Sequence, residues 1–270
     1  MESFDYLKSF YEAKDEDVRL LTRRGNVEFQ TTVRYIEKYL KKGMRVLEIG
    51  AGTGRYSHYF ARCGYTVDAV ELIPHNVEVF KEHTARGENV TVSQGDARDL
   101  SRYPDETFDI TLSLGPMYHL YTDADKEKAL TEAIRVTKKG GLLFVAYCMN
   151  EPTIIQYCFV KNQWRSTMER GMLDENFHCL SSPAEIFELY RTEDILSLTA
   201  GLPVERLHLV ATDLFTHYIP MAVENMDEET YACYLQYHFA VCERADLLGV
   251  SNHTLDILQK KIRADIRSAL

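Results

Sequence analysis

Three glycines at alternate positions, Gly50, Gly52 and Gly54, stand between an apolar run and a helical pattern. The run, residues 46–49, contains β-branched side chains and predicts a buried parallel strand. Residues 55–63 then predict a helix. Glycine lets the backbone turn sharply and lets a ligand approach without meeting a Cβ atom. The stretch therefore predicts a strand, a loop and a helix N-terminus that together hold a nucleotide-like ligand.

The spacing of these glycines distinguishes two kinds of ligand. A dinucleotide site uses G-x-G-x-x-G with the pyrophosphate on the helix N-terminus, whereas this loop reads G-x-G-x-G and follows Glu48. A carboxylate beside the loop would repel a pyrophosphate and would suit an ammonium group. Residues 48–54 resemble motif I of the class I S-adenosylmethionine-dependent methyltransferases, in which the loop packs against the methionine part of the cofactor.

Two later strand ends carry an acidic residue. Glu71 closes the predicted strand 65–71, where an acid can accept hydrogen bonds from both ribose hydroxyls in NAD enzymes and methyltransferases alike. Asp96 follows the predicted strand 90–94, and residues 95–97 resemble the family's adenine-binding motif. In that motif the aspartate accepts a hydrogen bond from the adenine amino group, and the next backbone N–H serves a ring nitrogen. An N-cap for the following turn is the alternative role of Asp96.

The resemblance implies S-adenosylmethionine as the cofactor and S-adenosylhomocysteine as its product. The cofactor-binding residues that it implies are Glu48, Gly50, Ala51, Gly52, Thr53, Gly54, Tyr56, Glu71, Leu72, Asp96, Ala97 and Leu114.

Residues 108–120 resemble the fourth strand and the post-strand segment of the same family, which lie beside the sulfonium and face the substrate. Tyr118 and His119 are therefore the catalytic and substrate-side candidates, and a neutral histidine there could take a proton from the acceptor. The alternative is that Tyr118 packs and His119 only shapes the pocket. Further substrate-binding candidates are Tyr11, Arg19, Arg24, Met117 and Trp164.

The order of the patterns predicts the fold class. Five alternations of strand and helix up to residue 147 indicate an α/β fold with a doubly wound, mostly parallel sheet and helices on both faces. The resemblance implies seven strands. Helices are predicted over residues 4–40, 123–137, 193–200 and 227–248, and later strands over 142–147 and 204–212.

We expect one domain with an inserted cap, built from four segments. These are an N-terminal helical lid (1–42), a cofactor-binding core (43–149), a helical cap rich in aromatic residues (150–191), and a C-terminal completion of the sheet with a long helix (192–270). The family's topology implies that residues 251–259 form a strand antiparallel to the fifth. A helix over 255–270 stays open as the alternative.

Composition narrows the partners. The net charge of -10 and the pI near 5.4 argue against nucleic acid, whose binding needs clustered Lys and Arg. No signal peptide and no apolar stretch near the ~20 residues of a membrane span are visible, so we expect a cytoplasmic protein without a membrane partner. The six cysteines include no C-x-x-C pair, so no metal is expected.

The predicted function is transfer of a methyl group from S-adenosylmethionine to a small organic acceptor bound under the cap. Whether the acceptor atom is O, N, S or C stays open, as does the oligomeric state. Two alternatives are a non-catalytic module that binds S-adenosylmethionine or S-adenosylhomocysteine, and an NAD-dependent oxidoreductase. The glycine spacing and Glu48 disfavour the oxidoreductase.

Overall fold

The computed structural model describes residues 3–13 and 16–262, and its centre is one eight-stranded sheet. The strand order is β3-β2-β1-β4-β5-β8-β7, and the short β6 pairs with β5 off this path. All pairings are parallel except those of β8 with β5 and β7. The strands are β1 (Arg45–Ile49), β2 (Thr66–Glu71), β3 (Val90–Gln94), β4 (Phe108–Ser113), β5 (Thr137–Met149), β6 (Leu189–Tyr190), β7 (Val204–Ala211) and β8 (His253–Lys260).

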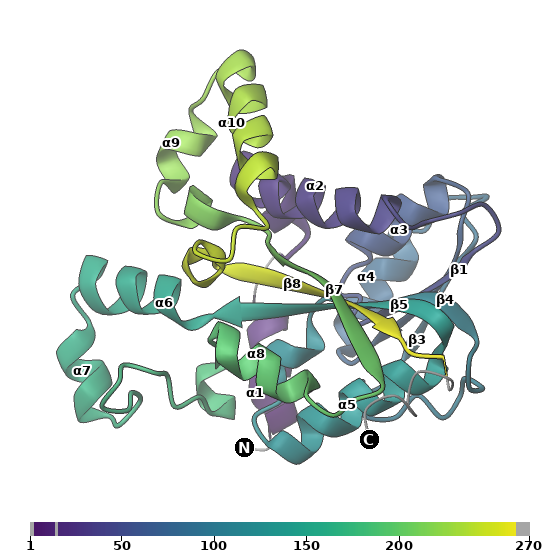
Figure 1. Cartoon of the computed structure of the whole chain (residues 1–270), viewed down its shortest axis with the longest axis horizontal. Helices are drawn as coiled ribbons and strands as arrows, with labels where there is room; N and C mark the ends of the chain where they lie inside the picture. Colours follow the sequence, from purple (N-terminus) through teal and green to yellow (C-terminus); the bar gives the residue numbers. More distant parts are fainter. Residues whose placement is uncertain (1–2, 14–15, 263–270) are drawn as a thin grey trace.

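Helices cover both faces of this sheet (Figure 1). On one face lie α2 (Arg23–Glu37), α3 (Arg55–Arg62) and α4 (Pro74–His83), and on the other lie α5 (Asp123–Val136) and α8 (Thr192–Thr199). Successive strand residues alternate between the two faces. Phe144 of β5 joins the core formed with α2 and α3, whereas Val145 joins the core formed with α5 and α8. The buried β-branched and aromatic runs therefore fold as a sheet that is covered on both sides.

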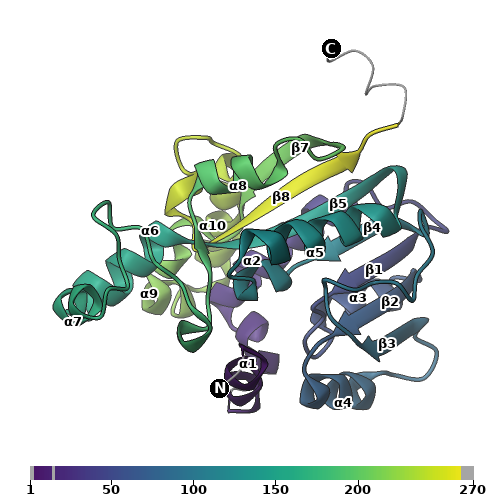
Figure 2. The same ribbon diagram turned by 90° about the horizontal axis from the view of Figure 1, so that it is seen from below.

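Several short elements gather at the edge where the parallel strands end. Figure 2 shows α6 and α7 extending beyond the end of β5, with α1 and α9 near the same edge. These elements are α1 (Ser3–Glu12), η1 (Glu16–Leu21), η2 (Pro116–His119), α6 (Asn150–Thr153), η3 (Ile154–Val160), α7 (Trp164–Glu169), η4 (Pro183–Glu185), η5 (Leu214–His217), α9 (Pro220–Glu224), α10 (Glu228–Val241) and η6 (Leu248–Val250). Within the described ranges, no helix is long and apolar enough to cross a membrane.

The predicted fold class is confirmed, and so is the strand near the C-terminus. β8 pairs antiparallel with β5, with Leu143 opposite Leu258 and Cys148 opposite His253. The helical alternative is wrong for residues 255–260, and its last part, 263–270, lies outside the described residues.

The strict alternation of strand and helix is wrong between β3 and β4. Residues 95–107, all described, form turns. The Asp96 side chain accepts the backbone N–H of Arg98, and the Asp99 side chain accepts that of Ser101. Short acidic side chains that bond their own backbone two residues on favour turns over a helix.

Three element boundaries also differ from the predictions. The expected helix over 4–40 is divided into α1, η1 and α2, and β5 begins at Thr137 rather than at residue 142. The helix expected over 227–248 ends at Val241. Its C-cap, Cys242, turns its carbonyl to the N–H of Ala211 in β7, and the next side chain, Glu243, accepts the hydroxyl of Tyr35. These contacts fix the residues after Val241 in a non-helical conformation and so end the helix there.

Candidate active site

A cavity of about 550 Å³ opens at the carboxyl ends of β1, β2 and β4, where ligands bind in open α/β sheets. It contains eleven of the twelve predicted cofactor residues, and Gly54 is the exception. Tyr11, Arg19, Tyr118 and His119 also line it, and α1 contributes Phe4 and Leu7 to its wall. Residues far apart in the chain thus enclose one space.

The glycine loop is fixed by packing and by the end of β2. The N–H of Gly52 donates to Glu71 Oε2 over 2.8 Å, which ties the loop to the neighbouring strand. Gly54 has φ +94°, and a Cβ atom built on it would lie 2.5 Å from the ring of Phe80. Glycine at position 54 is therefore required by packing behind the cavity. A Cβ atom on Gly52, with φ +55°, would meet no atom within 4 Å.

Glu48 places a carboxyl group at the floor of the cavity. Its side chain is 2% exposed and accepts a hydrogen bond from the hydroxyl of Ser57 in α3. Burial raises the pKa of Glu48 to about 8, against the hydrogen bonds from Ser57. The group is therefore mostly protonated near pH 7, and a cation placed beside it would favour its ionised form.

Two further acids mark the ends of the neighbouring strands. Glu71 also accepts the N–H of Ile73 over 2.8 Å and the amide of Asn76 over 3.3 Å, and burial raises its pKa. Asp96 is paired with the guanidinium of Arg98, at 2.6 Å between Nη2 and Oδ2. Burial raises the pKa of Asp96, but the hydrogen bonds from Arg98 outweigh it, and the net shift is downward. Asp96 is therefore an ionised carboxylate that Arg98 fixes in position.

His119 presents a ring nitrogen to the substrate side of the cavity. Its Nδ1 lies 2.9 Å from the carbonyl of Ile186, so Nδ1 carries the proton and Nε2 is an acceptor. The hydroxyl of Tyr11 donates to that Nε2 over 2.9 Å. Burial lowers the pKa of His119 to about 4, and the Ile186 hydrogen bond opposes this shift. His119 is thus neutral across the physiological range.

The segment that leads into β6, together with Tyr190 of β6, holds these residues in place. The carbonyl of Tyr118 accepts the N–H of Glu188 over 2.6 Å, and the carbonyl of Met117 accepts the hydroxyl of Tyr190 over 2.8 Å. Ile186 has φ +72°, which is uncommon for a β-branched residue. Its carbonyl accepts both His119 Nδ1–H and the hydroxyl of Tyr121. The strained backbone at Ile186 thus places its carbonyl oxygen within hydrogen-bond distance of both His119 and Tyr121.

Three predicted substrate residues lie away from the cavity lining. Met117 is fully buried among core residues of the α5 face. The Arg24 guanidinium lies on the surface, 3.8 Å from Glu224. Trp164 begins α7 and is 39% exposed. Contact with a substrate is thus a prediction that the described geometry does not support for these three.

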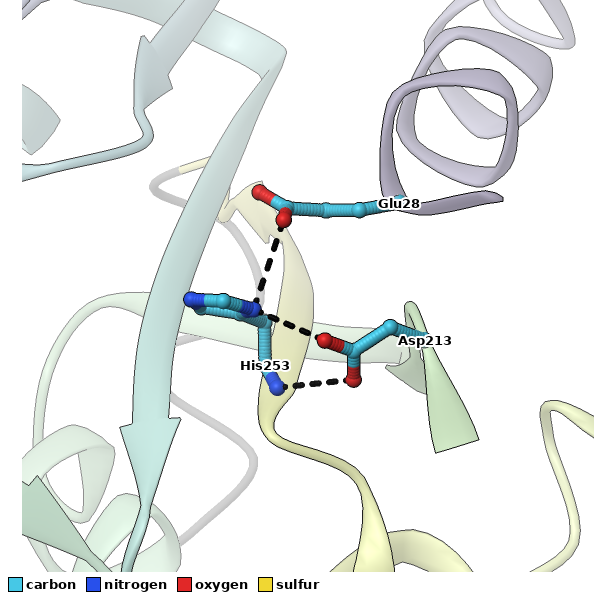
Figure 3. A group of neighbouring side chains, drawn as sticks. All are labelled: Glu28, Asp213 and His253. Atoms are coloured by element: carbon cyan, nitrogen blue, oxygen red, sulfur yellow. Dashed lines mark hydrogen bonds and ion pairs between the residues drawn. The ribbon is translucent and has the colours of Figure 1, made fainter. Parts of the chain in front are cut away.

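Sequence reasoning missed a buried charged cluster behind Tyr118. Glu28 of α2, Asp213 after β7 and His253 of β8 converge, with His253 Nδ1 lying 2.9 Å from Asp213 and 3.4 Å from Glu28 (Figure 3). Arg19 pairs with Glu28 at 2.6 Å. Burial alone would lower the pKa of His253, but Glu28 and Asp213 help to raise it well above its ordinary value. Two cations therefore compensate two carboxylates.

This cluster also links the N-terminal segment to the sheet. Asp213 Oδ1 accepts the Ser251 hydroxyl and the backbone N–H groups of Asn252 and His253, each within 3.0 Å. Arg19 lies in η1 and lines the cavity, so its ion pair with Glu28 joins the N-terminal segment to the sheet edge. An acidic residue directly after the predicted strand over residues 204–212 was the one sequence signal for it.

Residues 47–145, which contain the glycine loop and the strand ends around the cavity, match the methyltransferase domain family. This part of the chain is a methyltransferase domain. The cofactor of this family is S-adenosylmethionine.

Curated relatives share part of the chain. A ubiquinone biosynthesis O-methyltransferase of Maricaulis maris is 29% identical over 65% of this chain and 66% of its own length. A glycine/sarcosine N-methyltransferase of Aphanothece halophytica is 27% identical over 52% and 53%. A demethylmenaquinone methyltransferase of Thermobifida fusca is 39% identical over 43% and 48%. The matched part spans about half to two thirds of these relatives.

Solved methyltransferase structures share the fold. A Thermotoga maritima protein described as a possible histamine N-methyltransferase has a TM-score of 0.61 at 21% identity, covering 96% of this chain and 100% of that one. A SAM-dependent methyltransferase of Methanosarcina mazei has a TM-score of 0.57 at 16% identity, covering 84% and 97%.

The residues of the cavity fit the cofactor's chemistry. Glu48 offers a carboxyl group for the ammonium, Glu71 for the ribose hydroxyls and Asp96 for the adenine amino group. The open space around the Cα of Gly52 leaves room for a ligand close to the loop backbone.

Proposed function

We propose that this protein transfers a methyl group from S-adenosylmethionine to an O–H or N–H group of a small organic acceptor. The observation that carries this proposal is the neutral His119 in the wall of the same cavity as the glycine loop. Its Nε2 is a hydrogen-bond acceptor that takes the Tyr11 hydroxyl, and an incoming O–H or N–H group would replace that hydroxyl. A site that only stored the cofactor would not need an oriented hydrogen-bond acceptor on its substrate side.

The chain's residues hold the donor in this proposal. When bound, S-adenosylmethionine supplies an electrophilic methyl group. The loop from Gly50 to Gly54 and Glu48 hold the amino-acid end, Glu71 the ribose, and Asp96 with the N–H of Ala97 the adenine. Since positioning alone can contribute several kcal/mol to such a displacement, about 7–11 in well-oriented systems, rigid holding is the main task of these residues.

His119 orients the acceptor in this proposal. Its pKa of about 4 makes it a weak base, so its Nε2 aligns an acceptor O–H or N–H by hydrogen bonding rather than storing the proton. Tyr118 and Tyr11 form the adjacent aromatic walls. Two of the curated relatives are named as O- and N-methyltransferases, which supports a small acceptor of either kind.

The segment over residues 150–191 is proposed as the acceptor's cap. Pro183 of this segment lines the cavity, and Ile186 fixes His119 and Tyr121. The more distant α6 and α7 contribute no lining residue. In this proposal the inner part of the segment, residues 183–190, shapes acceptor specificity.

Thermal unfolding with S-adenosylmethionine, S-adenosylhomocysteine and NAD tests the donor first. A ligand at ~100 times its dissociation constant adds about 2.7 kcal/mol to the free energy of unfolding and raises the midpoint. We expect a rise with both adenosyl ligands and none with NAD. A panel of phenols, amines and carboxylic acids is then assayed for S-adenosylhomocysteine release. Stabilisation without turnover of any acceptor would support a binding module, and a response to NAD alone would overturn the proposal.

A further inference from the structure

Arg55 directly follows the glycine loop, begins α3 and lines the cavity. Its guanidinium carbon lies 4.5 Å from the ring centroid of Phe29, and Phe29 packs against Tyr56 with the centroids 5.0 Å apart. The Nε atom of Arg55 is buried and has no hydrogen-bond partner among residues 3–13 and 16–262. A buried N–H without a partner is uncommon, because it loses water without compensation.

The two other arginines of the cavity differ from Arg55 in their partners. Arg19 is paired with Glu28 at 2.6 Å, and Arg98 with Asp96 at 2.6 Å. No carboxylate in the described parts of the chain pairs with Arg55. Stacking on Phe29 fixes the guanidinium plane and leaves its N–H edges as donors, which suits a carboxylate in a bidentate geometry.

The surroundings of Arg55 also favour an anionic ligand such as a carboxylate. The N-cap of α3, Gly54, has no side chain to bond the first amide groups of the helix, and the positive end of a helix favours an anion. Glu48, seven residues earlier, lines the same cavity with an acidic group. An acid and a guanidinium on the two sides of one loop match the ammonium and the carboxylate of an amino-acid group.

We infer that Arg55 forms a carboxylate-binding subsite at the α3 end of the cavity. This inference rests on the proposed function, since it needs a ligand in that cavity. The carboxylate can come from the amino-acid end of the adenosyl cofactor or from the acceptor. The position of Arg55 next to the loop favours the cofactor.

Titration calorimetry on the full chain compares S-adenosylhomocysteine with its decarboxylated analogue, which keeps the ammonium and the adenosine. In Arg55→Gln we expect affinity for S-adenosylhomocysteine to fall about 10- to 100-fold, the size of a lost charge-assisted bond, and affinity for the analogue to stay unchanged. Arg55→Lys should lie between, since it keeps the charge and loses the planar fork. Arg62→Gln is the matched control, because Arg62 lies on the same helix and pairs with Glu88 outside the cavity.

A second experiment tests whether the bound carboxylate belongs to the acceptor rather than to the cofactor. Benzoate and uncharged benzamide are titrated into the complex with S-adenosylhomocysteine. Loss of benzoate binding alone in Arg55→Gln, with S-adenosylhomocysteine binding intact, assigns the subsite to an acceptor carboxylate. Equal effects on charged and uncharged ligands in both arms, or no effect in either, overturn the inference while the proposed function stands. A wild-type chain that binds no adenosyl ligand would instead contradict the proposed function itself.

Discussion

The hydroxyl of Tyr11 donates to Nε2 of His119 over 2.9 Å, joining α1 to the segment that follows β4. The two rings meet edge to face, with centroids 5.7 Å apart. The hydrogen-bond acceptor that the proposed function assigns to an incoming O–H or N–H is thus held by a phenol of the chain itself. An acceptor must share or displace that hydroxyl.

Tyr11→Phe keeps the ring and removes this competition. We expect the KM of the acceptor to fall by about fivefold, which corresponds to ~1 kcal/mol for one hydrogen bond, with cofactor affinity unchanged. His119→Ala should raise KM and lower kcat. Steady-state kinetics of both variants measures this, with Tyr6→Phe on the same helix as the control. A higher KM in Tyr11→Phe would show instead that Tyr11 itself binds the acceptor.

Glu48 should make cofactor binding release a proton. With a pKa of about 8 the free group is protonated at pH 7, and a bound ammonium lowers that pKa. Affinity should therefore rise by about tenfold per pH unit up to about pH 8 and then level off. Calorimetry in buffers of different ionisation enthalpy measures the released proton. Glu48→Gln should abolish both the release and the slope, and a wild-type chain that releases none contradicts the role.

The raised pKa of Glu48 also affects the stability of the protein without a ligand. The folded pKa of Glu48 lies above the unfolded value of 4.5. Its contribution to stability is therefore fully present below about pH 4.5 and is lost as the pH rises through about 8. Glu48→Gln should flatten that part of the pH dependence of unfolding.

Asp96→Ala should weaken S-adenosylhomocysteine binding by about 1–3 kcal/mol, because the adenine amino group loses its acceptor. Equilibrium titration measures the change. The substitution also removes a partner of Arg98, so Asp125→Ala, which removes the other partner at 2.8 Å, is the matched control. Equal losses in the two variants would assign the effect to Arg98 and not to adenine recognition.

Gly52→Ala should separate backbone strain from ligand contact. Gly52 and Gly43 both have positive φ, at +55° and +86°, and a Cβ atom on either meets nothing within 4 Å. Both alanine variants should lose about 1–2 kcal/mol of stability from strain alone. Because Gly52 lines the cavity and Gly43 does not, we expect Gly52→Ala alone to weaken cofactor binding. Unfolding and binding are measured side by side, and unchanged affinity in Gly52→Ala would remove the loop from the ligand contact.

Asp213→Asn should destabilise the fold by about 3–5 kcal/mol, the usual effect of breaking a buried ion pair. The raised pKa of His253 means that its stabilising contribution is present below about pH 6.5 and is lost as the pH rises through the higher folded value. Urea unfolding of the wild type and of the variant between pH 6 and 9 tests the sign. Asp246→Asn, in an exposed pair with Arg244, should have little effect.

The parts that sequence predicted are those in which one local pattern sufficed. The glycine loop, Glu71 and Asp96 each sit at the end of a strand, so parallel topology alone brings them to one edge. The cluster of Glu28, Asp213 and His253 could not be predicted, because its members are brought together only by the antiparallel return of β8 beside β5 and β7.

Two other misses have local causes. The turns at residues 96–101 depend on side-chain bonds to the backbone, which compete with a helix and leave no periodic pattern. Arg55 was visible as a residue type, but its lack of a partner among the described residues follows only from three-dimensional packing. Sequence thus predicted which residues meet at this edge of the sheet better than it predicted which charged side chain lacks a partner there.

The close packing of Gly50 against Pro116 limits which segments of this protein can be exchanged to change its specificity. A Cβ atom on Gly50 would lie 2.7 Å from Cδ of Pro116, so the glycine loop packs closely against the segment that follows β4. Replacing residues 115–121 with a loop from another protein would therefore disturb the glycine loop as well. New specificity is better sought in residues 183–190, of which Pro183 lines the same cavity.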